Sequence, residues 1–193
     1  SRRVFLAMSR PAADAHDSSS TAHGLDRLRV TEIFYSLQGE ARTVGYPTVF
    51  IRLTGCPLRC SYCDTEYAFY EGKKRTLTDL FDEVMAFDCP LIEVTGGEPL
   101  MQQTGVAELL RGLPAGFVIE VETNGTLEPA RELVARVDQW NVSPKLSKSG
   151  NRRSLRLRPQ VLATFKASGR AWLKLVVADE ADVEEAEQLI DKA

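Results

Sequence analysis

The sequence predicts an α/β fold in which a mostly parallel sheet is covered by outer helices and is either open or closed as a barrel. From about Leu28 onward, short apolar runs alternate with stretches of helical periodicity. Four of these runs end in polar or glycine-rich segments, and ligands on parallel sheets bind at the carboxyl ends of the strands. We expect one domain over residues 27–193, preceded by a disordered tail over residues 1–26, where Ala, Ser, Asp and His occur without a period.

The first half of the chain predicts two strands, a helix and a third strand. Residues 28–35 and 48–53 are rich in β-branched and aromatic residues, which favour strands. Residues 76–87 place their apolar side chains on one helical face, and Thr76 with Asp79 resembles a capping box. Leu91-Ile92-Glu93-Val94 is a short strand.

The second half continues the alternation of helix and strand. Val106, Leu109 and Leu110 mark a helix. The remaining predicted strands are 117–121, 139–142 and 172–177, and the remaining predicted helices are 129–137, 159–167 and 180–191. In the last helix we expect Val183, Ala186, Leu189 and Ile190 to face inward.

Composition narrows the functional class. Apolar residues make up 44% and charged residues 26%, as in an ordinary globular protein. The net charge of -3 gives no general reason to expect nucleic-acid binding, and no apolar run is long enough to span a membrane. Clustered, unpaired cysteines indicate a reducing compartment, so we expect a cytoplasmic protein with no nucleic-acid or membrane partner.

The segment Cys56-Pro-Leu-Arg-Cys60-Ser-Tyr-Cys63 follows the second strand and has the spacing C-x3-C-x2-C. Thiolates at this density are typical metal ligands. A structural zinc site needs four protein ligands, and the sequence contains no second C-x-x-C. Three thiolates instead suit an iron–sulfur cubane with one iron left open. Cys89, alone before Pro90, is interpreted as a small buried apolar residue.

Other strand ends carry residues with a possible ligand role beside a structural one. Thr95-Gly96-Gly97-Glu98-Pro99 offers close backbone approach, exposed amides and a carboxylate for an ammonium group, and the alternative is a tight turn before a helix. Asp64-Thr65 offers a hydroxyl ligand for Mg²⁺, against an ordinary turn. Gln38-Gly39-Glu40 is interpreted either as a hairpin connection or as a segment whose amide and carboxylate bind a ring that carries hydrogen-bond donors and acceptors.

Two basic features leave alternatives open. Arg52 lies in an otherwise apolar strand, so it either pairs with an acid or faces a ligand carboxylate. Residues 145–158 contain Lys145, Lys148 and four arginines with no acid. We interpret this segment as a solvated basic loop, with a phosphate or nucleic-acid contact as the alternative.

These segments together resemble the radical S-adenosylmethionine (SAM) superfamily and, within it, the 7-carboxy-7-deazaguanine synthase family. The cysteine loop and Gly96-Gly97-Glu98-Pro99 are marks of the superfamily. The segments that resemble the narrower family are Phe34-Tyr35-Ser36-Leu37-Gln38-Gly39-Glu40, Arg52-Leu53-Thr54-Gly55-Cys56, Cys63-Asp64-Thr65, Glu122-Thr123-Asn124-Gly125 and Ser143-Pro144-Lys145. The resemblance implies a partial (β/α) barrel of the radical SAM type.

The resemblance also implies an activity and its cofactors. A [4Fe-4S] cluster would reduce SAM, and the resulting 5'-deoxyadenosyl radical would take hydrogen from 6-carboxy-5,6,7,8-tetrahydropterin. Ring contraction and loss of ammonia would give 7-carboxy-7-deazaguanine, a precursor of queuosine. The implied partners are this small-molecule pterin and a reductant such as flavodoxin or ferredoxin, and the implied assembly is a homodimer.

Site roles carry over residue by residue. The resemblance makes Cys56, Cys60 and Cys63 the cluster ligands and Thr65 the Mg²⁺ ligand. It assigns the SAM pocket to Tyr62, Asp64, Gly97, Glu98, Ser143, Pro144 and Lys145, and the substrate contacts to Leu37, Gln38, Gly39, Arg52 and Thr95. No catalytic side chain is implied beyond these ligands.

The chain departs from the family pattern at two points. Ala41 stands where the family usually has glycine, which would strain a backbone of positive φ. The family continues past the last helix into a final strand, which we expect to be missing here. The rival hypotheses are a glycyl-radical activating enzyme and a non-catalytic Fe–S electron-transfer protein, and the latter leaves the strand-end motifs without a role.

Overall fold

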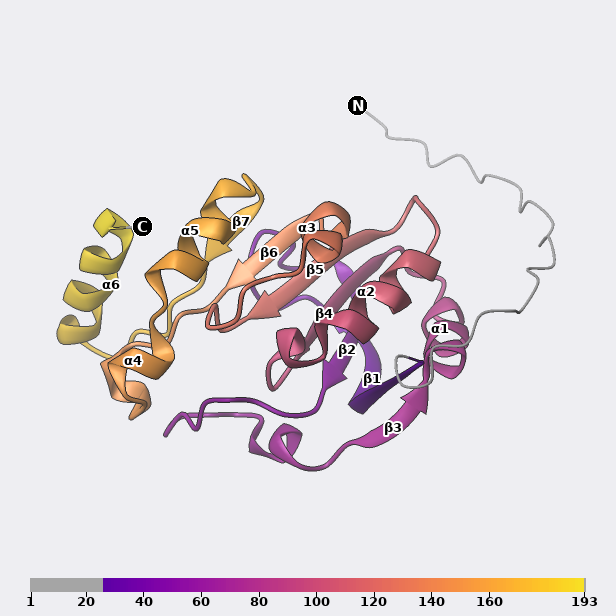
Figure 1. Ribbon diagram of the computed structural model, residues 1–193, viewed down its shortest axis with the longest axis horizontal. Helices are drawn as coiled ribbons and strands as arrows, with labels where there is room; N and C mark the ends of the chain where they lie inside the picture. The colour runs from indigo at the N-terminus through magenta and orange to yellow at the C-terminus, as the bar shows by residue number, and fades with distance from the viewer. Residues whose placement is uncertain (1–25, 193) are drawn as a thin grey trace.

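The computed structural model describes residues 26–192, which form a seven-stranded sheet with helices packed against it (Figure 1). The strands are β1 (Arg27–Leu37), β2 (Pro47–Leu53), β3 (Lys73–Thr76), β4 (Leu91–Gly96), β5 (Val118–Thr123), β6 (Gln139–Val142) and β7 (Ala171–Leu173). The α-helices are α1 (Leu77–Met85), α2 (Gln103–Gly112), α3 (Arg131–Arg136), α4 (Arg153–Arg156), α5 (Pro159–Ala167) and α6 (Glu180–Lys192). Short 3-10 helices are η1 (Glu66–Phe69), η2 (Pro99–Gln102) and η3 (Ser147–Ser149).

The sheet is mostly parallel, which confirms the predicted fold class. Its strand order is β3-β1-β2-β4-β5-β6-β7, and every pair from β2 to β7 is parallel. In the described part of the chain β3 and β7 lie at opposite edges, so the barrel is open. The antiparallel pairing of β1 with β2 and β3 was not predicted. The connection between β1 and β2 is too short for a crossover, so it can only form a hairpin.

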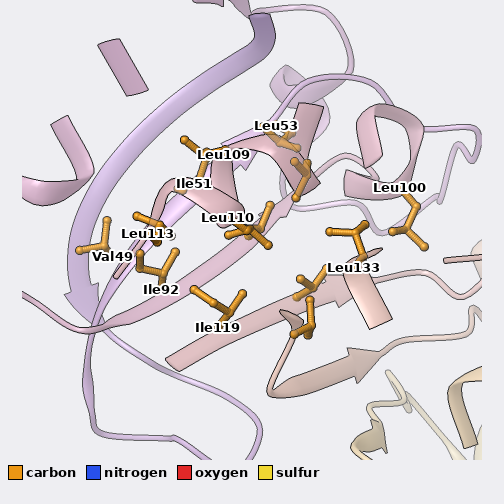
Figure 2. Close-up of a cluster of buried hydrophobic side chains, with 14 of the residues drawn as sticks. Val49, Ile51, Leu53, Ile92, Leu100, Leu109, Leu110, Leu113, Ile119 and Leu133 are labelled. Atoms are coloured by element: carbon orange, nitrogen blue, oxygen red, sulfur yellow. The ribbon is translucent and has the colours of Figure 1, made fainter. Parts of the chain in front are cut away.

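The hydrophobic core lies between the sheet and helices α1, α2 and α3 (Figure 2). Alternate residues of β2 point into it, and they meet apolar side chains from β4, β5 and the helices. The labelled members of this cluster are Val49, Ile51, Leu53, Ile92, Leu100, Leu109, Leu110, Leu113, Ile119 and Leu133. Burial of each such leucine or isoleucine side chain contributes about 1.5–3 kcal/mol.

Strand alternation places the opposite set of side chains on the other face of the sheet. In β4, Ile92 and Val94 belong to the core, while Glu93 and Thr95 line a cavity. Arg52 of β2 and Glu122 of β5 line the same cavity. Because successive side chains of a strand point to opposite faces, the apolar pattern that builds the core also fixes which residues face the cavity.

Local signals explain the start of α1. Thr76 is its N-cap, and the Thr76 hydroxyl accepts a hydrogen bond from the Asp79 backbone N–H at 3.1 Å. This satisfies one of the free amides of the first turn. The prediction of this cap from the sequence is confirmed.

The predicted strand over residues 172–177 was too long. The observed β7 ends at Leu173, and the Lys174 N–H donates to the Val142 carbonyl at 2.8 Å. Val142 is the last residue of β6. Val176 and Val177 have the β-branched side chains that favour a strand, but β6 ends at Val142 and leaves them no strand with which to pair.

The inward face of α6 was also predicted incorrectly in part. Ala186 is buried, but Val183 is 43% and Ile190 57% exposed. The helix is rotated so that Asp182 and Glu185 face η3 and α4, where Arg156 pairs with Glu185 at 2.8 Å. Ion pairing across this contact, together with burial of Ala186, decides which face is covered.

Two further sequence predictions concern the N-terminal tail and membrane-spanning segments. The predicted tail over residues 1–26 falls almost entirely outside the described residues. Within residues 26–192, no helix combines the length and the apolar character that crossing a membrane requires.

Ala41 adopts a backbone conformation that L-residues disfavour. Its φ is 59°, in the left-handed region that glycine occupies without a steric penalty. The departure from the family glycine therefore does produce the strain that the sequence suggested, at a cost of about 1–2 kcal/mol.

We expect Ala41→Gly to increase the free energy of unfolding by about 0.5–1 kcal/mol, because relief of strain outweighs the added entropy of the unfolded chain. Urea denaturation measures this change. The matched control is Ala115→Gly, an exposed turn position that is not among the positive-φ residues, where a small loss of stability is expected. A loss of stability at both positions would contradict the assignment of strain to Ala41.

Candidate active site

A cavity of about 540 Å³ lies at the carboxyl ends of β2, β4, β5 and β6, where a parallel sheet is expected to bind its ligand. All but two of the predicted site residues line it. Those lining it are Leu37, Gln38, Gly39, Arg52, Cys56, Cys60, Tyr62, Cys63, Asp64, Thr65, Thr95, Gly97, Ser143 and Lys145. Glu98 and Pro144 do not line the cavity.

The three clustered cysteines are half-buried along one part of the cavity wall. Each sulfur has one polar side chain near it. Asn151 Nδ2 donates to Cys60 Sγ at 3.3 Å, and Asn124 Nδ2 donates to Cys56 Sγ at 3.8 Å. Cys63 Sγ lies 3.8 Å from the hydroxyl of Thr65, the predicted Mg²⁺ ligand.

The chemistry of this donor set fits a cluster. Burial raises the pKa of Cys56 to about 11 and also raises the pKa of Cys60. These thiols would hold their protons in the absence of a cation, and iron would displace them. Among the described residues, no group of three or more His, Cys, Asp or Glu side chains lies close enough together to hold a single metal ion.

Cys89 does not contribute a fourth ligand to this site. It is buried in the core, where its thiol donates to the Pro47 carbonyl at 3.3 Å. Its interpretation as a small buried residue is confirmed. Within residues 26–192 the cysteine loop therefore has three thiols and no fourth cysteine beside it.

The two glycines after β4 allow two loops to touch. A Cβ at Gly97 would lie 2.1 Å from the Gly55 carbonyl oxygen, so only glycine fits. The Gly97 and Glu98 amides donate to the carbonyls of Leu53 and Gly55 at 3.0 and 2.7 Å. The expectation of exposed amides was therefore wrong for these two positions, since both fasten this loop to the start of the cysteine loop.

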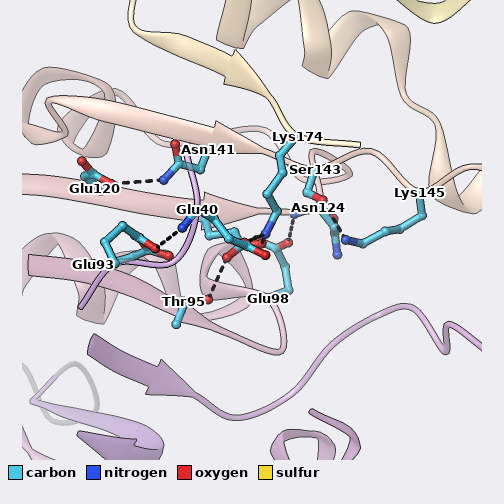
Figure 3. Close-up of polar contacts among 12 residues, drawn as sticks. Glu40, Glu93, Thr95, Glu98, Glu120, Asn124, Asn141, Ser143, Lys145 and Lys174 are labelled. Carbon is cyan, nitrogen blue, oxygen red and sulfur yellow. Dashed lines mark hydrogen bonds and ion pairs between the residues drawn. The ribbon is translucent and has the colours of Figure 1, made fainter. Parts of the chain in front are cut away.

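Glu98 is fully buried and holds three segments together (Figure 3). Its Oε1 accepts from the Thr123 hydroxyl at 2.8 Å and from the Leu100 N–H at 3.0 Å. Its Oε2 accepts from the Asn124 N–H at 2.8 Å. Burial raises the pKa of Glu98, while these donors and Lys145 oppose that shift. The geometry gives this carboxylate a positioning role.

Arg52 pairs with an acid, as one of its two interpretations predicted. Its Nε pairs with Glu32 Oε1 at 2.7 Å, and its guanidinium carbon lies 5.6 Å from the centre of the Phe34 ring. The same side chain lines the cavity. Glu32 and the Phe34 ring thus hold this guanidinium in the cavity wall.

Gln38 is both a turn residue and a cavity residue. It is buried, its Oε1 accepts from the Glu40 N–H at 3.1 Å, and its Nε2 donates to Glu93. Glu93 lies in the middle of β4 with its side chain in the cavity wall. Since Glu93 and Glu40 hold the amide from both ends, Gln38 presents one fixed orientation.

Three carboxylates from neighbouring strands gather at this part of the sheet, namely Glu93, Glu120 and Glu122. Burial, followed by the charges of Glu122 and Glu120, raises the pKa of Glu93 to about 8. Glu93 is therefore mostly protonated at neutral pH. Lys174, which follows β7, contacts both Glu40 and Glu122 and provides the cation that partly balances this group (Figure 3).

Glu93, Glu122 and Lys174 line the cavity although none was predicted as a site residue, and Glu122 was noted only as part of the motif Glu122-Thr123-Asn124-Gly125. A glutamate inside the apolar run Leu91–Val94 was a usable signal, because charged residues are rarely buried without a function or a partner. Lys174 could not be identified from such a signal, because only the folded path of the chain after β7 brings it to the cavity wall.

The basic segment 145–158 is only in part the solvated loop that was predicted, since Arg152, Arg153 and Arg158 are exposed but Arg156 is not. Arg156 is buried and pairs with Glu185, and its Nη1 also donates to the Lys145 carbonyl at 2.8 Å. Lys148 pairs with Asp179. Asp179, just before α6, and Glu185, within α6, are distant in sequence from these two cations and neutralise them, so the charge of the segment alone was misleading.

Comparisons with known proteins agree with this geometry. The Radical SAM superfamily model matches residues 50–169. The 7-carboxy-7-deazaguanine synthase of Pyrobaculum aerophilum is 42% identical over 168 residues, covering 85% of this chain and 73% of that protein. The synthase of Hyperthermus butylicus is 39% identical over 169 residues, covering 86% and 72%.

A solved structure shares the fold. The crystal structure of QueE from Escherichia coli matches with a TM-score of 0.66 and 26% sequence identity, covering 86% of this chain and 79% of that chain. Sequence and structure thus agree over most of the chain. The chain belongs to the radical SAM superfamily and, within it, to the 7-carboxy-7-deazaguanine synthase family.

Proposed function

We propose that this chain is a radical SAM carbon–nitrogen lyase that converts 6-carboxy-5,6,7,8-tetrahydropterin to 7-carboxy-7-deazaguanine, with loss of ammonia, in queuosine biosynthesis. The observation that carries the proposal is that a single cavity gathers the three-cysteine loop, the glycine loop and the Gln38, Arg52 and Thr95 side chains. A cavity of this size suits a small molecule, whereas a glycyl-radical activating enzyme must admit a protein segment.

The cofactors are a [4Fe-4S] cluster, SAM and Mg²⁺, which when bound supply the radical that abstracts hydrogen and the cation that orients the substrate. In this proposal Cys56, Cys60 and Cys63 hold the cluster, and Thr65 contributes to the Mg²⁺ site. The chain itself supplies positioning and shielding. We propose that residues 27–193 act together as the radical SAM domain.

The SAM end of the cavity is assigned to residues around the cluster loop. Tyr62, Asp64, Gly97, Ser143 and Lys145 line the wall there. Lys145 Nζ donates to Ser143 Oγ at 2.9 Å, which fixes both groups beside the cysteines. We propose that Glu98 and Pro144, which lie behind this wall, shape the pocket.

The substrate end is assigned to Leu37, Gln38, Gly39, Arg52 and Thr95. Arg52 offers a guanidinium for the substrate carboxylate, and Gln38 offers a fixed amide for the pterin ring. Thr95 lies 3.5 Å from Glu122 Oε2, so its hydroxyl has an acceptor on one side and the cavity on the other.

Two further features belong to the proposal. The electron would come from a reductant such as flavodoxin or ferredoxin. A homodimer and a cytoplasmic location remain predictions from the family resemblance and from the reduced cysteines, as does the absence of nucleic-acid and membrane partners.

Product formation tests the function directly. The anaerobically reconstituted protein, given reductant, SAM, Mg²⁺ and 6-carboxytetrahydropterin, should form 7-carboxy-7-deazaguanine, detected by mass spectrometry. Cys60→Ala should reduce the rate by at least about 1,000-fold, because a cluster ligand is lost. Cys89→Ala is the matched control and should retain activity, since Cys89 is buried in the core. Equal activity of the two variants, or no product from the unaltered chain, would refute the assignment.

The protonation of Glu93 makes a separate prediction about stability. Its pKa rises from an ordinary value of 4.5 to about 8 in the native state. Between these values the native protein keeps a proton that the unfolded chain has released. The free energy of unfolding should therefore decrease as pH rises through this range, by up to about 1.4 kcal/mol per pH unit.

Glu93→Gln should flatten that pH dependence, measured by urea denaturation of the cluster-free protein between pH 5 and about 8.5. The control is Glu187→Gln, at an exposed position of α6, which should follow the unaltered protein. If the Glu93→Gln protein loses stability as steeply as the control, Glu93 is already ionised in the native state.

A further inference from the structure

Of the three carboxyl groups on β4 and β5, Glu93 is the one that lines the cavity without an ion pair. Glu122 lines the cavity but pairs with Lys174, and Glu120 does not line it. Within the described part of the chain Glu93 forms no ion pair. The only side-chain hydrogen bond that it accepts comes from Gln38 Nε2. A polar group in a cavity wall that the protein leaves partly unpaired is a candidate for binding the ligand.

One oxygen of Glu93 is available to a ligand. Gln38 Nε2 donates to Oε2, while Oε1 accepts no hydrogen bond from the described residues. Glu93 Oε1 is not one of the fully buried side-chain atoms that lack a partner. It therefore reaches the surface of the cavity, whose wall includes Glu93. By contrast, Oε1 of Glu120 is buried without a partner, so Glu120 offers no acceptor to the cavity.

Gln38 places a hydrogen-bond donor beside this acceptor. Its Oε1 accepts from the Glu40 N–H at 3.1 Å, which turns its amide nitrogen toward Glu93. The amide nitrogen carries two hydrogens, and Glu93 uses one of them. The second N–H of Gln38 and Oε1 of Glu93 therefore form a neighbouring donor and acceptor in the cavity wall.

The substrate of the proposed function has a complementary edge. The pyrimidine ring of 6-carboxytetrahydropterin carries a 4-oxo acceptor, an N3–H donor and a 2-amino donor in a row. The second N–H of Gln38 matches the 4-oxo group, and a carboxylate at Glu93 matches N3–H and the 2-amino group. Each carboxylate oxygen has two acceptor sites, so Oε2 accommodates Gln38 and N3–H together. Two parallel hydrogen bonds to one carboxylate add specificity as well as affinity.

The positions of the cavity residues fit the two ends of this substrate. Arg52 pairs in register with Thr95, and Glu93 precedes Thr95 by two residues on the same face of β4 (Figure 3). In register with Glu93 itself, β2 contributes the uncharged Phe50. At about 3.3 Å per residue, Glu93 and Arg52 lie about 7 Å apart along the strand direction. A pterin has about this length between its pyrimidine edge and the carboxyl group on C6, so both ends are held at once.

We propose that Glu93, together with Gln38, binds the 2-amino-4-oxo edge of the pterin and selects for its 2-amino group. The inference rests on the proposed function, because that function supplies the pterin. The substrate contacts predicted from the sequence include Gln38 but no carboxylate. A site built to accept a hydrogen bond from a substrate group discriminates strongly against an analogue that lacks this group.

The protonation of Glu93 adds a second signature of binding. In the protein without ligand, burial and the charges of Glu122 and Glu120 raise the pKa of Glu93 to about 8, while Gln38 and Lys174 oppose that shift. Two pterin donors favour the ionised carboxylate, so the pKa of Glu93 falls on binding. Below about pH 8 the pterin therefore displaces a proton from Glu93 to solvent, and the affinity increases as pH rises toward this value.

The test measures the binding of two stable analogues by calorimetry. The reconstituted holoenzyme is used without reductant, so no turnover occurs. The analogues are 6-carboxypterin and 6-carboxylumazine, in which a 2-oxo group replaces the 2-amino group. The unaltered protein should bind 6-carboxypterin at least about 100-fold more tightly than 6-carboxylumazine. Glu93→Gln should reduce this preference to less than about 10-fold, because its amide donates to a 2-oxo group that a carboxylate repels.

The same titrations count protons when they are repeated in buffers of different ionisation enthalpy. At about pH 6.5, binding of 6-carboxypterin should release about one proton more from the unaltered protein than from Glu93→Gln. A purely structural role of Glu93 would not produce this difference.

The matched control is Glu120→Gln, which makes the same change on the neighbouring strand. Glu120 is the register partner of Glu93 in β5, but it does not line the cavity. This variant should keep both the preference for 6-carboxypterin and the release of a proton. An equal loss of preference in both variants would show a general charge effect and overturn the proposal.

Three further results would overturn the proposal. The first is equal affinity of the unaltered protein for both analogues, which stands even if Glu93→Gln folds poorly. The second is a Glu93→Gln protein that keeps the full preference, and the third is an unaltered protein that binds neither analogue. The proposed function fails separately, through lack of product from 6-carboxytetrahydropterin in the unaltered, reduced enzyme.

Discussion

The buried carboxylate of Glu98 is the contact on which the rest of the site depends. Its oxygens accept hydrogen bonds from the start of η2 and from Thr123 and Asn124 after β5. Its own backbone N–H donates to Gly55, beside the first cysteine. One residue thus fixes the ends of β2, β4 and β5 relative to one another. Loss of one of these donors would lower the free energy of unfolding by about 1–3 kcal/mol, because the buried carboxylate would be left with an unsatisfied oxygen. The geometry of these strand ends is therefore held tightly.

The core and the cavity result from the same strand pattern. In β4 the residues that face the helices are apolar and those that face the cavity are Glu93 and Thr95. This arrangement places three carboxylates on neighbouring strands, and Lys174 forms an ion pair with one of them, Glu122. The repulsion among these carboxylates is reduced because Glu93 stays protonated. Glu93 also accepts a hydrogen bond from Gln38.

Local pattern predicted the parallel part of the sheet and its strand ends, and the resemblance to the family supplied about half of the residues of the cavity wall. Apolar alternation located β2, β4 and β6, and the motifs at their ends converge, since parallel strands end at the same edge. Features that depend on distant pairing were not predictable. Contacts between segments far apart in the chain determine three such features. They are the antiparallel pairing of β3, the orientation of α6 through the Glu185–Arg156 ion pair, and the position of Lys174 in the cavity wall.

The central claim is that three cysteines leave one iron of the cluster open to SAM, and Mössbauer spectroscopy of the ⁵⁷Fe-reconstituted protein tests it most directly. SAM should change the spectrum of one iron in four, because its amino and carboxylate groups would raise the coordination number of that iron alone. The other three irons, each held by a thiolate, should be unaffected. A spectrum in which SAM changes none of the irons would show that the cluster has four internal ligands, and would contradict the enzyme proposed here.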